Sequence, residues 1–408
     1  MNVSEAPSQS SSGTGSAFEV FKVFLMLGCT SFGGPIAHLG YFREEFVARR
    51  KWLEERVYAD LVALCQFTPG PASSKVGIGI GLSRAGLPGA LAAWIGFTLP
   101  SALALILFAF GVESFAKDSD AGWLHGLKVV AVAIVAQAVW GMARNLTPDA
   151  QRFTLAVGAS IIAMLSPTTW GQVGAILVGA LVGVLWLGAK VDDSHVAMRI
   201  SLGKTAGAVS LALFFALLIG LPIFAAVYPS QSLALFDSFY RSGSLVFGGG
   251  HVVLPLLQSE VVPTGWVSND AFLAGYGAAQ AVPGPLFTFA AYLGAIMGPE
   301  PSGWAGAALC TAAIFLPALL LTIGVLPFWD DLRRFRTVRS ALVGVNAAVV
   351  GLLLAALYHP VWTSAIHSPP DFAFGLVAFA LLVFWKTPPW LVVILSAVTG
   401  WGLEHVLQ

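Results

Sequence analysis

The sequence has few charged residues and no stretch that fits a soluble domain. Only 10% of its 408 residues are charged, and 57% are hydrophobic. Soluble domains carry about 25% charged residues, so a soluble particle of this size could not cover its surface with so few. The composition therefore predicts a polytopic membrane protein and excludes a cytosolic enzyme and a secreted disulfide scaffold.

Two further deficits exclude other classes of protein. Lys plus Arg number 21, as do Asp plus Glu, so the chain lacks the excess of basic residues that marks a nucleic-acid binder. The 3 cysteines are scattered, without the spacing of a zinc site or a disulfide framework, and we expect no metal and no cofactor. Residues 1–17 are rich in Ser and Gly and lack Lys and Arg, which predicts a disordered tail rather than a secretory signal.

Apolar segments fill the rest of the chain, and most approach the ~20 residues that cross a bilayer as a helix. We expect an all-α fold, because an open sheet edge in lipid would leave backbone groups without hydrogen-bond partners. The segments are 18–42, 57–83, 87–111, 122–142, 153–165, 169–188, 204–228, 233–258, 271–298, 303–327, 338–358, 372–385 and 388–403. The segments at 153–165 and 372–385 are short for a span.

An internal repeat organises these segments. Glycines, phenylalanines, prolines, a tryptophan and a glutamine recur in the same order at a nearly constant spacing. The pairs include Phe32, Gly33 and Gly34 with Phe247, Gly248 and Gly249, Trp52 with Trp266, and Gln66, Pro69, Gly70 and Pro71 with Gln280, Pro283, Gly284 and Pro285. We interpret the chain as two homologous repeats, 18–188 and 229–408, joined by a polar linker and a connecting transmembrane helix at 189–228.

Loop charges indicate that the two repeats have opposite orientations. The loop 43–56 is rich in Lys and Arg, whereas its counterpart 251–270 has neither, and the next pair reverses this, with the arginines in 325–340 rather than in 111–127. Lys and Arg in short loops mark the cytoplasmic side. Inverted repeats are a common plan of transporters, with the substrate site near the midplane between them.

The sequence is compatible with two membrane topologies, which differ in the number of spans. If 18–42 and 233–258 are re-entrant, the basic linker 189–203 lies inside with the other basic loops, the N-terminus is cytoplasmic and the C-terminus external. If both cross fully, one short segment fails to span and the linker lies outside. We prefer the re-entrant solution.

Two kinds of motif break the apolar segments. Paired glycines loosen a helix, and Pro-Gly-Pro cannot continue one, so we expect half-helices that meet inside the membrane. Their free N–H groups and positive dipole ends outline an anion site, although each end contributes only about 0.3–1 kcal/mol and several must converge. The alternative is that the breaks only kink helices for packing. The candidate substrate ligands are Gly33, Gly34, His38, Gln66, Pro69, Gly70, Pro71, Ser73, Ser74, Lys75, Gly248, Gly249, His251, Gln280, Pro283, Gly284, Pro285 and Thr288.

Five titratable residues near the breaks invite a chemical role. Lys75 lies in an apolar run and is a candidate counter-charge for an anion, unless it snorkels to the interface. His38 and His251 could bind an anion or carry a proton, or serve as satisfied core residues. Arg43 and Glu260 flank the breaks and are candidates for gating or proton coupling, or else they mark the membrane edge.

In combination, the Ser-Phe-Gly-Gly-Pro and Pro-Gly-Pro motifs of both halves resemble the chromate ion transporter family, in its long two-domain form. The resemblance extends from about residue 18 to 403. It implies export of chromate, a tetrahedral dianion like sulfate, across the bacterial cytoplasmic membrane, and hence chromate resistance. It places the family's motif positions on Gly33, Gly34, Pro35, His38, Gln66, Pro69, Gly70 and Pro71 and on their second-half equivalents. Lys75 departs from the amide that is usual at its position.

The sequence thus predicts a secondary transporter with alternating access, driven by the membrane potential or a proton gradient because no ATP-binding element is visible. Chromate or sulfate and the lipid bilayer are the expected partners, nucleic acid is not, and a homodimer is left open. One alternative is a transporter or channel for sulfate or another anion. Another is an intramembrane enzyme acting on a lipid phosphate, which would need a nucleophile, base or metal cluster that the sequence does not reveal.

Overall fold

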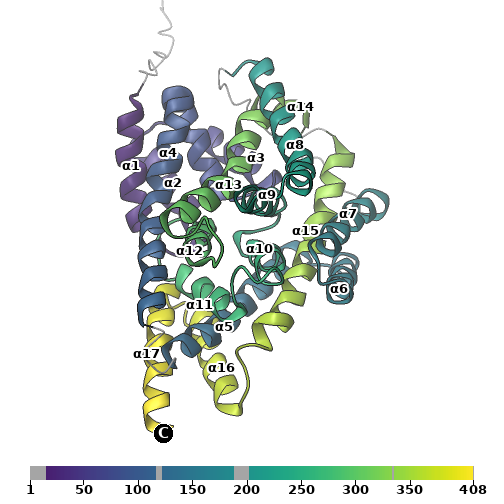
Figure 1. Ribbon diagram of the computed structural model, residues 1–408. Helices are drawn as coiled ribbons and strands as arrows, with labels where there is room; N and C mark the ends of the chain where they lie inside the picture. The colour runs from purple at the N-terminus through teal and green to yellow at the C-terminus, as the bar shows by residue number, and fades with distance from the viewer. Residues whose placement is uncertain (1–14, 116–121, 188–201, 333–334, 408) are drawn as a thin grey trace, which may run out of the picture.

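A computed structural model describes residues 15–115, 122–187, 202–332 and 335–407. Every regular element in these ranges is helical (Figure 1). Among them, 6 helices are long and apolar enough to cross a membrane. The all-α, polytopic membrane fold that the composition predicts is therefore confirmed. Most of the predicted tail (residues 1–14) and of the polar linker (188–201) lies outside the described residues.

The helices fall into a first half, a connecting helix and a second half. The first half contains α1 (Ala17–Thr30), α2 (Gly34–Arg43) with a π-helical extension (Glu44–Arg49), α3 (Glu55–Phe67), α4 (Ala72–Phe115), α5 (Gly122–Leu146), α6 (Ala150–Leu165) and α7 (Thr169–Trp186). The connecting helix is α8 (Lys204–Val227). The second half contains α9 (Gln231–Ser244), α10 (Val253–Val261), α11 (Asn269–Ala279), α12 (Phe289–Ile296), α13 (Gly303–Val325), α14 (Trp329–Leu332), α15 (Arg336–Ala356), α16 (Pro369–Val383) and α17 (Pro389–Leu407). Short 3-10 turns, Gly250–Val252 and Leu286–Thr288, precede α10 and α12.

Glycines break the first apolar segment of each half. In the first, Gly33 and Gly34 have φ of 98° and 79°, and in the second, Gly248 and Gly249 have φ of 74° and 158°, values that side chains rarely tolerate. The helix before each break is the longer of the two that flank it. These helices, α1 and α9, have 14 residues each. At 1.5 Å per residue such a helix covers roughly 21 Å, which falls short of the ~30 Å hydrocarbon core.

Contacts between loops show that the broken segments of the first half turn back. The backbone N–H of Gly15 donates to the carbonyl of Arg84 at 3.1 Å, and the Arg84 guanidinium lies 4.9 Å from the ring of Trp52. The start of α1, the α2–α3 loop and the kink of α4 at Ala85 and Gly86 therefore share one end of the molecule. This geometry agrees with the re-entrant solution.

The second half repeats this return. The backbone N–H of Gly298, just after α12, donates to the carbonyl of Trp266 at 3.2 Å. Trp266 lies in the α10–α11 loop, as Trp52 lies in the α2–α3 loop. The pair α11 and α12 therefore also comes back to the end from which it starts.

The long helices that follow the breaks, α4 and α13, run in opposite directions. The rings of Trp94 and Phe315 are 6.0 Å apart, and those of Phe110 and Trp304 are 5.7 Å apart. From Trp94 to Phe110 along α4, the neighbouring residue on α13 thus moves backward along the chain, from Phe315 to Trp304. The long helices that follow the breaks, one from each half, therefore contact each other in an antiparallel manner.

The two halves are also interlocked. Helix α5 packs against α16 and α17 of the second half, and α15 packs against α6 and α7 of the first. The crossings are close because glycines lie there: a Cβ on Gly126 would collide with the backbone of Ser396, and one on Gly344 with that of Gly179. Small residues allow such approaches between membrane helices.

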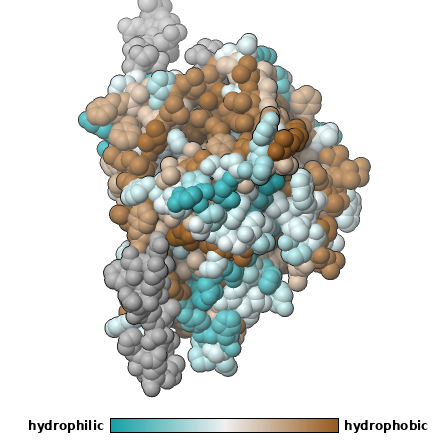
Figure 2. Space-filling model, viewed as in Figure 1, coloured by the Kyte–Doolittle hydropathy of each residue, from teal (hydrophilic) through white to brown (hydrophobic). Residues whose placement is uncertain are grey.

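The surface suits a lipid environment. Figure 2 shows hydrophobic residues over the upper and right parts of one face, whereas polar residues gather in its middle and lower parts, where Figure 1 places α10, α11 and α16. Helix α8 is the most exposed long helix, with only 6% of its most apolar stretch buried. Exposed Val209, Phe215 and Ile219 on this helix are typical of a span surrounded by acyl chains.

Candidate functional site

Each Pro-Gly-Pro segment is hydrogen bonded to the glycine break of the other half. The backbone N–H of Gly70 donates to the carbonyl of Val246 at 2.7 Å, and that of Gly284 donates to the carbonyl of Ser31 at 2.9 Å. Gly70 and Gly284 are equivalent residues of the repeat, and both carbonyls directly precede a Phe-Gly-Gly sequence. The four breaks therefore meet in reciprocal pairs at the contact between the halves.

A cavity of about 170 Å³ lies at one of these pairs. It joins the start of α2, from the first half, to the Pro-Gly-Pro segment and the 3-10 turn before α12, from the second. Helices α5 and α17 close its sides. The lining residues are Gly33, Gly34, Pro35, Ile134, Gln137, Ala138, His251, Ala279, Gln280, Val282, Gly284, Leu286 and Pro389.

The groups that line the cavity suit an anion. The start of α2, at Gly33, and the 3-10 turn after Pro285 have no side-chain cap, so their first N–H groups carry partial positive charge without a side-chain partner. The side-chain nitrogen of Gln280 is buried and has no hydrogen-bond partner among the described residues. Helix starts and amide donors of this kind bind oxyanions.

The equivalent place at the other pair of breaks is filled. A Cβ on Gly248 would lie 3.1 Å from Leu146 Cδ1 and 3.3 Å from Met142 Cε, and Met142 also covers Gly249. Gln66, the equivalent of Gln280, is exposed and does not line the cavity described above. Of the predicted ligands, the structure therefore brings Gly33 and Gly34 together with the second Pro-Gly-Pro segment at the cavity, whereas Gly248 and Gly249 do not line it.

Lys75 has a different position from the one expected of an anion ligand. Its side chain is fully buried and does not line the cavity. The ammonium donates to the carbonyl of Thr68, to Thr68 Oγ1 at 2.8 Å and to the carbonyl of Pro69 at 3.0 Å. These oxygens form the carbonyl end of α3, where a cation is stabilised by the helix dipole. Lys75 thus caps the broken helix.

The two predicted histidines have different surroundings. His38 is buried, and its Nε2 lies 3.1 Å from the carbonyl of Ser31, so Nε2 carries the hydrogen and Nδ1 is left to accept from Ser73 Oγ at 3.3 Å. It links the first break to the start of α4. His251 lies in the cavity wall, where its Nδ1 is 2.7 Å from the hydroxyl of Tyr276.

The predicted hydroxyls take no direct part in the cavity. Ser73 contacts His38, and Thr288 Oγ1 donates to the carbonyl of Pro285 at 2.7 Å. The buried hydroxyl of Ser74 has no hydrogen-bond partner among the described residues. None of the three lines the cavity. Pro69, Pro71 and Pro283 shape the breaks without lining the cavity.

Arg43 lies where a residue at the membrane edge would lie. It is exposed, and its Nε donates to Glu55 Oε1 at 2.7 Å across the α2–α3 loop. This hydrogen bond lowers the pKa of Glu55. Nothing in the geometry connects Arg43 with the cavity.

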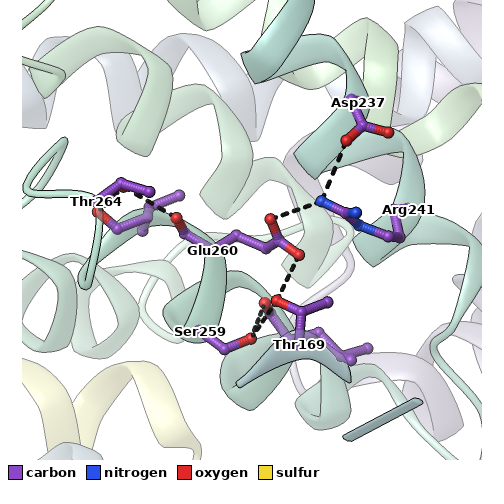
Figure 3. Close-up of polar contacts among 8 residues, drawn as sticks. Thr169, Asp237, Arg241, Ser259, Glu260 and Thr264 are labelled. Atoms are coloured by element: carbon purple, nitrogen blue, oxygen red, sulfur yellow. Dashed lines mark hydrogen bonds and ion pairs between the residues drawn. The ribbon is translucent and has the colours of Figure 1, made fainter. Parts of the chain in front are cut away.

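Glu260 belongs to a buried cluster of charges (Figure 3). Arg241 Nη2 contacts Glu260 Oε2 at 2.9 Å and Asp237 Oδ2 at 3.1 Å. Thr169, the first residue of α7, donates its hydroxyl to Glu260 Oε1 at 2.7 Å. The cluster therefore joins α9 and α10 of the second half to α7 of the first.

Sequence reasoning missed three polar residues near the breaks. Gln137 lines the cavity, and Asp237 and Arg241 hold the charge cluster. The sequence did contain a signal for them. An amide or a charged side chain within an apolar segment is costly in lipid, and such a residue is therefore a candidate for a functional role. Among the described residues no group of three or more His, Cys, Asp and Glu side chains could hold a metal ion.

Comparison with known proteins identifies the family to which the sequence is similar. The sequence profile of the chromate transporter family matches residues 18–187 and 233–401. The chain is 28% identical to the chromate transport protein of Pseudomonas aeruginosa over 395 residues, which covers 94% of this chain and 91% of that one. It is 23% identical to the chromate transport protein of Cupriavidus metallidurans over 382 residues, with 90% and 88% covered.

A relative from Synechococcus elongatus, a probable chromate transport protein, is 26% identical over 395 residues, with 94% of each chain covered. No solved structure gives a significant match. The relatives are transporters rather than enzymes, so the alternative of a lipid-phosphate enzyme is discarded. The matches span both halves and nearly the whole length of the chain, and the chain therefore belongs to the chromate transporter family.

Proposed function

We propose that this protein is a secondary transporter that exports chromate across the bacterial cytoplasmic membrane by alternating access and so confers chromate resistance. The observation that carries the proposal is the cavity in which the start of α2 from one half meets the Pro-Gly-Pro segment of the other. Two relatives that match nearly the whole chain are named chromate transport proteins. A site built from both halves opens to either side when the halves move against each other.

The two repeats, 18–188 and 229–408, are inverted copies in this proposal. The antiparallel contact of α4 with α13 and the alternation of basic loops support that arrangement. The N-terminus is then cytoplasmic and the C-terminus external. With an inside-negative potential, outward movement of two negative charges releases about 4.6 kcal/mol per 100 mV, so export is favoured even without a coupled ion.

The anion is held by neutral donors in this proposal. The free N–H groups at the start of α2 and after Pro285, with the amide nitrogen of Gln280, surround the dianion, and His251 lies at the wall. Lys75 acts on the anion indirectly, without lining the cavity. By capping the carbonyl end of α3, it offsets a partial negative charge that would repel an anion near the breaks.

The test is transport by purified protein in liposomes, with radiolabelled chromate. Vesicles that contain unlabelled chromate should exchange it for labelled chromate, and an inside-positive potential should drive accumulation of the dianion. Liposomes without protein are the control. Absence of exchange in either direction would exclude the function.

Sulfate is the second candidate substrate, because it shares the shape and charge of chromate, and the cavity offers no group that separates the two. Competition by unlabelled sulfate in the same vesicles decides the question. Sulfate that inhibits labelled chromate exchange as well as unlabelled chromate does would make the protein a general transporter of tetrahedral dianions.

A further inference from the structure

We propose that Asp237, Arg241 and Glu260 form a proton-binding site that couples the movement of the anion to an opposing proton. The inference rests on the proposed function and names its coupling ion. The cluster is separate from the cavity, since none of the three residues lines it.

The first argument is the balance of charge. One guanidinium serves two carboxylates, and the exposed fractions of the side chains are 9% for Asp237, 8% for Glu260 and 15% for Arg241. When all three are ionised, the cluster keeps one surplus negative charge in a place with little water. A buried charge without a partner is costly, and two carboxylates near one another disfavour double ionisation. Binding one proton at either carboxylate makes the cluster neutral.

Neighbouring elements do not supply the missing positive charge. Helix α13 has no charged residue, Lys204 lies at the far start of α8, and Arg336 and Arg339 lie at the start of α15. Asp270, at the start of α11, pairs with Lys128 at 3.2 Å. Helix α7 offers Thr169 and Gln172, which are neutral. Within the described residues, only a proton is left to balance the surplus carboxylate.

The second argument is a comparison with the equivalent position in the first half. Glu45 corresponds to Glu260 in the repeat, and its side chain is just as buried, with 7% exposed. It is paired with two cations, Arg50 and, at 3.2 Å, Arg49. There the positive charges outnumber the carboxylate, so no surplus negative charge remains to be balanced. The two halves therefore differ in proton binding where their backbones correspond.

The third argument is the location of the cluster. Glu260 lies near the end of α10 and Arg241 near the end of α9, the two helices that flank the second glycine break. Thr169 is the first residue of α7 in the other half. A proton bound at Glu260 weakens the ion pair with Arg241, which joins α9 to α10. It also weakens the hydrogen bond that Glu260 accepts from Thr169, which joins α10 to α7 of the other half. Binding and release of the proton thus change the same contact that must move during alternating access.

The coupled step is balanced as follows. A carboxylate of the cluster takes up one proton from the external solution and becomes a carboxylic acid, and after the conformational change the proton is released into the cytoplasm as the anion leaves the cell. At one-to-one coupling, with the membrane potential clamped at zero, a tenfold proton gradient sustains about a tenfold chromate gradient, since each corresponds to about 1.4 kcal/mol.

The experiment uses the full chain in liposomes clamped with potassium and valinomycin. Acid-inside vesicles should accumulate chromate as protons leave, and reversing the pH gradient should expel it. Glu260→Gln should keep the exchange of chromate for chromate at equal pH. Under a tenfold proton gradient, its accumulation of chromate should be about tenfold lower than that of the wild-type protein. Glu45→Gln is the matched control and should keep both activities. Asp237→Asn is the second variant and should behave like Glu260→Gln.

The outcomes separate the two proposals. Wild-type protein that exchanges no chromate at all contradicts the transport function itself. Wild-type protein that exchanges chromate but ignores the pH gradient overturns the proton site alone. Accumulation by Glu260→Gln at the wild-type level overturns it as well, as does equal loss in Glu45→Gln. If both cluster variants lose chromate-for-chromate exchange together with accumulation, the cluster serves folding or anion binding and the proton proposal is wrong.

Discussion

The two Pro-Gly-Pro segments have the same backbone role but different surroundings. Gly70 and Gly284 have φ of 105° and 98°, and each donates a backbone hydrogen bond to the other half. At the first segment the ammonium of Lys75 occupies the carbonyl end of the helix and Gln66 is exposed. At the second, Gln280 faces a cavity and Phe289 replaces the lysine. The two segments therefore share a backbone geometry, and a few side chains decide which of them borders the cavity.

Substitution of Gly284 should have the largest effect, because it removes the scaffold that the two segments share. A Cβ there would lie 2.8 Å from Ser101 Oγ and 3.2 Å from the carbonyl of Phe97, at a positive φ that a β-branched residue does not tolerate. Gly284→Val should lower stability by several kcal/mol, about 3 or more, and abolish chromate exchange. Thermal unfolding in detergent and liposome exchange measure both.

Gly158→Ala is the matched control for that substitution. A Cβ at Gly158 meets nothing within 4 Å, and the residue lies inside α6. Alanine there should leave transport unchanged and raise stability slightly, by about 0.5–1 kcal/mol. If Gly284→Val transports at the wild-type rate, the crossed hydrogen bonds are not needed for the function.

Lys75→Met tests what distinguishes the first segment. It leaves the carbonyl oxygens of Thr68 and Pro69 without their donor, at about 1–3 kcal/mol for each buried unsatisfied group, while removing a buried charge offsets part of that loss. We expect a net loss of stability of about 2 kcal/mol and chromate affinity weakened by about tenfold. Titration of tryptophan fluorescence with chromate measures the affinity. Unchanged affinity would confine Lys75 to a structural role.

Gln280→Leu and Gln66→Leu are equivalent substitutions that compare the two Pro-Gly-Pro segments directly. Loss of one hydrogen bond to a charged ligand amounts to about 1.5–3 kcal/mol, so Gln280→Leu should weaken chromate binding by at least about tenfold. Gln66→Leu should leave the affinity unchanged, because Gln66 is exposed outside the cavity. Equal effects of the two substitutions on affinity would mean that both copies of the site bind the anion.

The positions of the breaks could be predicted from the sequence because the cause is local. Gly33, Gly34, Gly70, Gly248, Gly249 and Gly284 all have positive φ, as paired glycines and Pro-Gly-Pro suggest. The all-α membrane fold followed with equal directness from the lack of charge. In these cases a single residue type or the overall composition limits the backbone, whatever its tertiary surroundings.

The difference between the two copies could not be predicted, because it depends on distant residues. Met142 and Leu146 of α5 fill the space beside Gly248, and nothing in the motif itself reveals that. The direction of Lys75 depends on the turn at Thr68, and the partner of Glu260 on α7 is 91 positions away in sequence. Repeat symmetry predicts equivalent backbones but gives no information on such long-range contacts.

Helix α8 has a consequence for how a duplicated gene can yield this molecule. The end of α7 lies beside Ser340 near the start of α15, and Trp329, just before α15, donates to Asp60 of α3, so the first half finishes at the end of the molecule at which it begins. Two such copies fused head to tail would point the same way. In the inverted arrangement proposed above, one additional crossing by α8 reverses the second copy, and deleting this helix would turn an antiparallel pair into a parallel one.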